Sequence, residues 1–197
     1  MNKNLGKNEP LRLTDEELCV AAAFMEIPCL YGVSDRFWKR GGGSLKKRVL
    51  DVCGSLEFAG WLFVEPGGTV RLRTSLYRAL ACMGSPEAVA RLFAAGAAGM
   101  KRACLYRRGE MVYARCLDET ESLLKQVADE EELACFLGWD RSSEIRDCGA
   151  LVLVKNGAFY EKRADLVWKT ENAPEERAAL LREAWAALTT GGRKEEA

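Results

Sequence analysis

Apolar positions along this chain follow helical spacing in some stretches and strand alternation in others, with turn residues between them. The clearest helix begins after Thr14, which forms a capping box with Glu17 three residues later. Its end is expected near Glu26, because Pro28 disfavours helical geometry in the residue before it. The chain therefore opens with a well-defined helix followed by a connection over 28–43.

The second predicted helix runs from an N-cap at Ser44 to a stop at Gly60. Its apolar stripe, which we expect to face the core, consists of Leu45, Val49, Val52 and Leu56. Further helices are expected at 74–83, 119–128, 129–138 and after Asn172. Helices therefore occur along the whole chain, separated by shorter extended stretches.

Three hairpins are predicted, and they join 61–64 to 69–73, 102–106 to 111–116, and 150–154 to 158–160. In the last of them, the dipeptide Asn156-Gly157 favours a type I′ turn. The stretch 87–95 fits either a helix or a strand, and 94–99 has the composition of a loop. Helices mixed with local hairpins indicate an α+β fold.

The expected architecture is a mostly antiparallel sheet built from hairpins, with flanking helices. We expect one α+β domain over residues 1–190, and a frayed tail over 191–197. Hydrophobic residues make up 48% of the chain and charged residues 29%, which is typical of a folded protein rather than a disordered one.

The chain contains no histidine, and this absence limits its chemistry. It excludes Ser-His-Asp triads, Cys-His pairs and zinc helices of the HExxH type, which all need an imidazole. No other nucleophile stands in a recognisable arrangement with a base. We therefore expect no enzymatic activity, no catalytic residues and no cofactor.

Eight cysteines occur, and no two are closer than ten positions, so there is no CxxC pair. Without that spacing and without histidine we expect no metal site, and we interpret the cysteines as small buried hydrophobic residues. No apolar run approaches the ~20 residues needed to span a bilayer, and residues 1–6 lack the apolar core of a signal peptide. The expected location is the cytoplasm, without membrane insertion.

Two features suggest a binding surface. Phe37 and Trp38 stand side by side among charged residues in the 28–43 connection, and exposed aromatic residues in such a setting suggest contact with a protein. The glycines at 41–43 precede a helix, as in phosphate-binding loops. The GxxxxGK[ST] spacing is absent, however, so a flexible connection is the favoured interpretation.

A winged-helix DNA-binding regulator is the alternative. A helix, a second helix and a two-stranded ribbon follow one another in that fold's order, and Lys46, Lys47, Arg71 and Arg73 would contact DNA. Lys plus Arg and Asp plus Glu number 29 each, so the net charge is zero, which disfavours nucleic acid as the partner. One continuous basic face would support this alternative, whereas scattered charge would argue against it.

Three segments carry a resemblance to a known family: "GWLFVEPGGTVRLRTSLYRALACMGSPE", "CLYRRGEMVYARC" and "EELACFLG". Over about residues 11–165 the chain resembles the EspG-type proteins associated with type VII (ESX) secretion, and related Gram-positive accessory proteins. The resemblance implies a central antiparallel sheet with flanking helices. The chain is shorter than the typical member of the family.

The same resemblance implies a non-enzymatic cytosolic chaperone or adaptor that binds a helical secreted protein and shields its apolar tip. In that family a loop between long strands contacts the substrate. The corresponding loop here is 95–101, and Met100 is its most prominent apolar side chain. Phe37, Trp38 and Met100 are therefore the predicted partner-binding residues.

Overall fold

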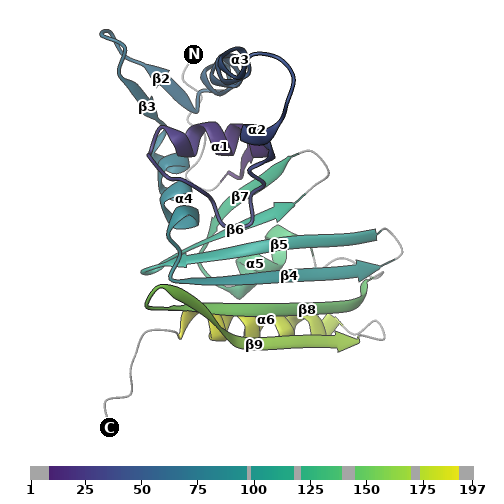
Figure 1. The fold of residues 1–197 in the computed structure, drawn as a ribbon. Coiled ribbons are helices and arrows are strands. Elements are labelled where there is room, and N and C mark those ends of the chain that lie inside the picture. Colours follow the sequence, from purple (N-terminus) through teal and green to yellow (C-terminus); the bar gives the residue numbers. More distant parts are fainter. Residues whose placement is uncertain (1–8, 97–98, 118–120, 139–144, 170–173, 191–197) are drawn as a thin grey trace.

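The computed structural model describes residues 9–96, 99–117, 121–138, 145–169 and 174–190 (Figure 1). Seven strands form one antiparallel sheet in the order β1-β7-β6-β5-β4-β8-β9. These strands are β1 (Leu11–Leu13), β4 (Ala88–Gly96), β5 (Gly99–Arg108), β6 (Met111–Leu117), β7 (Ser122–Val127), β8 (Ile145–Asn156) and β9 (Phe159–Lys169). A separate hairpin consists of β2 (Leu62–Val64) and β3 (Val70–Leu72).

Helices lie on both faces of the seven-stranded sheet. They are α1 (Asp15–Ala23), α2 (Arg36–Lys39), α3 (Leu45–Phe58), α4 (Thr74–Gly84), α5 (Glu130–Leu137) and α6 (Pro174–Thr189). On one face, α6 lies across β4, β8 and β9, while α5 lies on β7. On the other face, α4 packs on β5 and β6, α1 packs on α4, and α3 packs on α1 (Figure 1). The predicted α+β class, with a large antiparallel sheet and flanking helices, is confirmed.

The first helix forms as its sequence predicts. Thr14 accepts a hydrogen bond from the Glu17 amide at 3.1 Å, and the Glu17 carboxylate accepts one from the Thr14 amide at 2.8 Å. This capping box satisfies two amides that the helix itself leaves without partners. The helix ends at Ala23, before the expected end near Glu26, and Glu26 takes a positive φ of 56° in the turn that follows.

The prediction of a helix over 119–128 is wrong. Residues 122–127 form strand β7, and residues 118–120 lie outside the described part of the chain. Leu124 is buried because β7 pairs with β6 on one side and with Leu11–Leu13 on the other. Pairing with β6 and β1 therefore decided the conformation of this segment over its local helix preference.

The ambiguous stretch 87–95 is strand β4, which lies between β5 and β8. The loop expected over 94–99 is instead the end of a long hairpin, since Ala95 pairs with Met100. The β8–β9 hairpin is also longer than predicted. Its turn lies at 157–158, because Asn156 pairs with Phe159, so the expected type I′ turn on Asn156-Gly157 is wrong by one residue.

The apolar stripe of α3 is only partly a core element. Val52 and Leu56 are buried and Val49 is half-buried, whereas Leu45, at the start of α3, is 45% exposed. Ser44 precedes the helix as expected, but its side chain makes no capping hydrogen bond. The tail expected over 191–197 lies outside the described residues.

Candidate protein-binding site

One half of a sheet face is left open beside the helical layer. At the start of β4, Val89 is buried beneath the helical layer, whereas further along the same side of the strand Arg91 is exposed and Phe93 is only half-buried. On β9, Val167 is exposed on the same side. The far ends of β4 and β5, together with β8 and β9, therefore present a sheet surface that no described helix covers on this face (Figure 1).

A hollow of about 400 Å³ lies where this open surface meets the connection between α1 and α2. Its lining residues are Gly32, Arg91, Leu92, Phe93, Arg102, Ala103, Cys104, Leu117, Ala150, Leu151, Asp165 and Leu166. Most of these residues are apolar, and all except Gly32 come from five strands whose backbones are fixed by the sheet ladder. The hollow is therefore a shallow apolar basin with a rigid floor and a few charged groups around it.

The floor depends on a glycine. A Cβ placed on Gly149 would lie 2.3 Å from a ring carbon of Phe93 and 2.8 Å from the carbonyl oxygen of Leu166. No side chain fits there, so the Phe93 ring lies directly against the backbone of β8. The glycine thus gives the basin an aromatic base.

The wall of the basin is the connection that carries Gly32, and a buried arginine holds it in place. Arg115 on β6 is only 1% exposed, and its guanidinium donates to the Gly32 carbonyl (2.7 Å), to Ser122 Oγ (2.9 Å) and to Asp15 Oδ1 (2.5 Å). Three charge-assisted contacts of this kind compensate the cost of burying the charge. Arg115 therefore ties the connection, α1 and β7 to one point.

A tyrosine adds a second tie to the same connection. The Tyr106 hydroxyl donates to the Tyr31 carbonyl at 2.9 Å, and burial raises the pKa of the Tyr106 phenol far above its usual value, so it stays protonated as the donor. The Arg91 guanidinium lies 5.1 Å from the centroid of the Tyr31 ring, within cation–π range. The wall of the basin is thus held by both side-chain and ring contacts.

The rim of the basin carries more free positive than negative charge. Arg91 and Arg102 are both exposed beside it. The lining carboxylate of Asp165 already pairs with Lys162 at 3.3 Å. A partner with apolar side chains and an adjacent acidic group, or the carbonyl end of a helix, would match this arrangement.

Met100, the predicted contact residue, lies beside this basin. It belongs to strand β5 rather than to a loop, its side chain is 57% exposed, and its sulfur lies 3.2 Å from Nε of Arg102. Residues 97 and 98 of the predicted loop lie outside the described part of the chain. The structure therefore places Met100 at the rim, and its contact with a partner stays a prediction.

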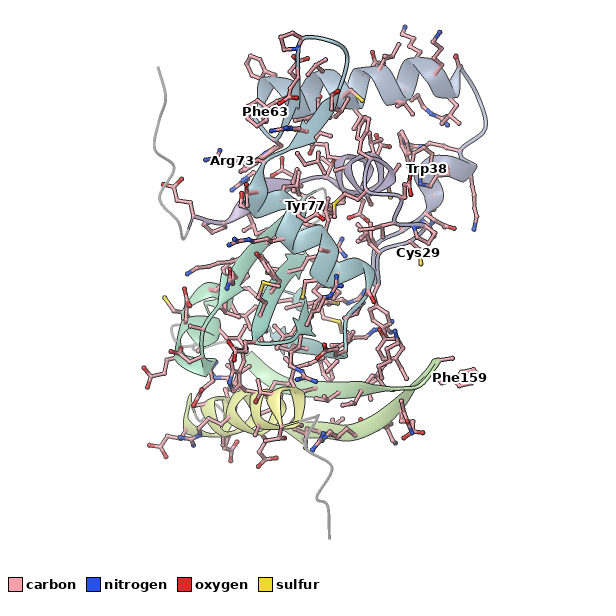
Figure 2. All side chains as sticks on the ribbon, turned by 90° about the vertical axis from the view of Figure 1, so that its left-hand side faces the viewer. Cys29, Trp38, Phe63, Arg73, Tyr77 and Phe159 are labelled. Atoms are coloured by element: carbon pink, nitrogen blue, oxygen red, sulfur yellow. The ribbon has the colours of Figure 1, made fainter. Side chains whose placement is uncertain are left out.

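The two predicted aromatic residues differ from each other. Both belong to the short helix α2, but Phe37 is buried, so the expectation that it lies exposed on a contact surface is wrong. Its ring packs edge-on against Trp38 at 4.8 Å between centroids. Trp38 is 39% exposed and, together with Cys29, lines a second hollow of about 290 Å³. Figure 2 shows these two residues near each other on one side of the molecule.

The basic residues of the winged-helix hypothesis do not form one face. Residues 46–47 lie in the first turn of α3, whereas the β2–β3 hairpin follows its last turn. Arg71 pairs with Glu65 at 3.0 Å, and the Arg73 guanidinium lies over the Trp61 ring at 5.2 Å. This arrangement lacks the continuous basic surface that DNA binding by this module requires.

The eight cysteines all lie in the described part of the chain and form no disulfide; they include three buried, two exposed and three half-buried residues, the last being Cys19, Cys53 and Cys116. Cys82, Cys104 and Cys148 are buried, as expected, and burial raises the pKa of Cys82 to about 12. Cys29 and Cys135 are exposed, so the interpretation as buried hydrophobic residues is wrong for these two. Within the described residues, no group of three or more Cys, Asp or Glu side chains is placed to hold a metal ion.

Sequence reasoning missed most of the basin. Arg91 and Phe93 alternate with small residues at 88, 90 and 94, which is the pattern of a strand with one tightly packed and one open side. That pattern was available in the sequence, but it has meaning only once 87–95 is assigned to a strand. The contributions of Gly149 and Leu151 depend on the pairing of β4 with β8, which no local motif indicates.

The fold defines the class of this protein as α+β, with a seven-stranded antiparallel sheet and flanking helices. Among solved structures, it is similar to EspG5, the type VII secretion system chaperone of Mycobacterium tuberculosis, seen in complex with the PE25-PPE41 dimer. The TM-score is 0.62 at 9% sequence identity, and the match covers 94% of this chain and 99% of that one. No family profile and no curated protein matches the sequence. At this identity the likeness establishes the fold.

No helix in the described part of the chain combines the length and the apolar character needed to cross a membrane.

Proposed function

We propose that this chain is a non-enzymatic cytosolic chaperone or adaptor that binds a helical protein client of a type VII-like secretion system. The observation that carries the proposal is the open, apolar basin on one half of the sheet face. The similarity of fold to EspG5, a chaperone seen with the PE25-PPE41 dimer, supports the kind of partner. The client would be bound before export and released to the secretion machinery.

The basin suits the tip of a helix or helical hairpin. A helix with its side chains is about 10–12 Å across, so only its end, not its length, fits into a hollow of this size. Phe93, Leu117 and Leu151 would cover apolar residues at the tip. Arg91 and Arg102 would then lie near acidic side chains or near the carbonyl end of the helix.

The test is affinity capture from the native host's cytosol with matched variants. Wild type, a rim variant (Met100→Glu with Arg102→Glu) and a distant variant (Phe159→Glu) would be compared against a tag-only control by mass spectrometry. All three substituted side chains are exposed, so the fold should tolerate the changes. We expect a small helical secreted protein with wild type and the distant variant, and its loss with the rim variant.

Two results would contradict the proposal. The first is equal capture of the same proteins by all three forms, which would place binding away from the basin. The second is the recovery of nuclease-sensitive DNA with no specific protein, which would favour the winged-helix alternative. A photo-crosslinking side chain at position 100, compared with one at position 159, would then locate the contact directly.

A further inference from the structure

A groove of about 700 Å³ lies towards the β1 edge of the large sheet, where β6 and β7 meet the start of α4. Its lining residues are Glu9, Pro10, Leu11, Trp61, Arg73, Thr74, Ser75, Arg78, Tyr113, Leu124, Lys125, Gln126, Ala128 and Glu132. None of these residues lines the basin, so the two sites are separate. The volume is within the range of sites that bind ligands in proteins. We call this site the α4 groove.

The floor of the α4 groove is apolar and its backbone is fixed. Leu11 on β1 pairs in register with Leu124 on β7, and both are buried, as is Tyr113 on β6. The ladder from β1 through β7 to β6 holds these strands together. Trp61 is half-buried and Pro10 is exposed, so they add apolar surface that solvent reaches. An apolar side chain of a ligand would therefore find a preformed contact in the groove.

Two arginines of the α4 groove have no carboxylate partner in the described part of the chain. Arg78 is exposed and lies one turn beyond Thr74, on the same face of α4. Arg73 directly precedes α4, and its guanidinium lies 5.2 Å from the centroid of the Trp61 ring, which holds it in place. Figure 2 shows Arg73 between the β2–β3 hairpin and α4. The groove thus offers two guanidinium groups, whose planar N–H donors match the oxygens of a carboxylate.

The carboxylates that line the α4 groove limit what it can bind. Glu132 is already engaged, because it pairs with Lys125 at 2.7 Å and accepts a hydrogen bond from the Ala128 amide at 2.9 Å. Glu9 is exposed, and no described cation pairs with it. These two carboxylates disfavour a compact polyanion, and the zero net charge of the chain disfavours nucleic acid. A chain that spaces its acidic groups between apolar side chains avoids this repulsion.

We propose that the α4 groove binds an extended acidic segment of a partner protein, in which apolar and acidic side chains alternate. Successive side chains of an extended chain point to opposite sides. Its apolar side chains would therefore face the floor of the groove, and its carboxylates would reach Arg73 and Arg78. Capture of acidic motifs by clustered arginines is a general mode of peptide recognition. The proposal does not depend on client binding at the basin.

The first test is the fluorescence anisotropy of a short fluorescein-labelled peptide, in which leucine alternates with glutamate, titrated with the full chain. The control is the same peptide with glutamine in place of every glutamate. We expect the glutamate peptide to bind about tenfold more tightly than the glutamine peptide, because only carboxylates pair with the arginines. Its affinity should fall as salt is added, since the groove is open to solvent.

The second test changes the charges of the groove in both directions. Arg78→Gln should raise the Kd of the glutamate peptide about tenfold, whereas Glu9→Gln should lower it about threefold by removing a like charge. The matched control is Arg36→Gln, which removes an exposed guanidinium on α2, outside the groove, and should change the Kd by less than about twofold. Opposite signs at two positions of one groove cannot both come from a damaged fold.

A charge reversal supplies a gain of binding as the third test. Arg78→Glu should lose the glutamate peptide and bind a peptide in which lysine replaces glutamate, which the wild-type chain should not bind. A variant that misfolds would lose both peptides. The switch of preference therefore reports the contact at Arg78 and not the stability of the chain.

Equal affinity for the glutamate and glutamine peptides would overturn the proposal, as would a Kd above about 1 mM for the glutamate peptide. An unchanged Kd in Arg78→Gln would place binding elsewhere. Displacement of the peptide by an equal concentration of inorganic phosphate would show a site for small anions instead. The basin variant, Met100→Glu with Arg102→Glu, should bind the peptide as the wild type does, so failure of this proposal is distinguishable from failure of client binding at the basin.

Discussion

Helices α6 and α3 both carry an apolar face at helical spacing, yet the elements that surround them differ. On α6, Leu180, Leu181, Ala184 and Leu188 are all buried, because the helix lies across three strands of the sheet. Helix α3 packs on α1 and contacts the short strand β2, so two of its apolar residues are buried and others stay in solvent. The comparison shows that apolar spacing identifies the apolar face of a helix. Whether that face is buried in the core or exposed to solvent depends on which elements pack against it.

The two sides of strand β4 repeat this contrast within a single strand. On the α6 side, Ala88, Ala90 and Ala94 are buried, and their small side chains let the helix approach the sheet closely. On the other side, Arg91 and Phe93 face the basin. One strand therefore supplies a closed core and an open site at once.

The largest expected effect is a difference in stability between a variant of α6 and a variant of α3. Leu180→Ala removes a fully buried side chain and should lower the free energy of unfolding by about 2–5 kcal/mol. Leu50→Ala, on the outward face of α3, should change it by less than about 0.5 kcal/mol in dilute monomeric protein. Urea denaturation of both variants measures this. Similar losses would contradict the assignment of the α3 face to solvent.

Loss of the Arg115 hydrogen bonds, which join the sheet to the helical layer, should have the next largest effect on stability. Arg115→Met leaves the Gly32 carbonyl and Ser122 without their donor, so unfolding should become easier by about 2–3 kcal/mol. Hydrogen exchange at the Tyr31 amide, which bonds to the Met83 carbonyl, should accelerate.

The control for this experiment is an exposed ion pair at the edge of the same sheet. Arg12 pairs with Glu121 at 2.9 Å, and 69% of the Arg12 side chain and 38% of the Glu121 side chain are exposed. Arg12→Met should therefore cost no more than about 0.5 kcal/mol. If both arginine variants behaved alike, Arg115 would not hold the connection.

A smaller effect depends on pH. The Lys125 ammonium and the Ala128 amide bond the Glu132 carboxylate and lower its pKa below the usual 4.5. Because the folded-state pKa is lowered, the stability from this carboxylate is fully present above the unfolded-state pKa and is lost as pH falls through the folded-state pKa. Glu132→Gln should thus cost about 0.5–1 kcal/mol at neutral pH. In acid the two proteins should converge, whereas a constant difference across pH would rule out the carboxylate as the cause.

The smallest effect leaves stability untouched and reports exposure alone. Cys29 and Cys135 should react with a maleimide in the native protein. Cys82 should react only after unfolding, because burial keeps it protonated and inaccessible. Peptide mass spectrometry at increasing labelling times distinguishes them. Early labelling of Cys82 would contradict its complete burial between α4 and the sheet.

Local signals predicted the elements that are stabilised locally. The capping box at Thr14 forms, and α5 lies between its N-cap Asp129 and its C-cap Gly138, whose φ of 65° suits a glycine. The 61–73 hairpin also occurs as predicted, because its two strands and its turn lie within one short segment. These elements need no distant partner to define their bounds.

Elements defined by distant partners escaped the same reasoning. Residues 122–127 form a strand that pairs with β6 along its whole length and, on its other edge, with β1, more than a hundred residues earlier in the chain. The basin needs Gly149 on β8 to lie under Phe93 on β4, and Gly32 to be held by Arg115. Met100 was found through a family resemblance, while the exposure of Phe58 follows from what α3 packs against rather than from its sequence.

The pairing of β4 with β8 also sets an order of events during synthesis. The hairpins from β4 to β7 can close as soon as they leave the ribosome, whereas β8 is made roughly fifty residues after β4, several seconds later at ordinary rates of translation. Throughout that interval β4 has an unpaired edge and an uncovered alanine side, both open to other strands. The nascent chain is thus most prone to aggregation in its middle. This period ends when the β8–β9 hairpin pairs with the open edge of β4 and α6 covers its alanine side.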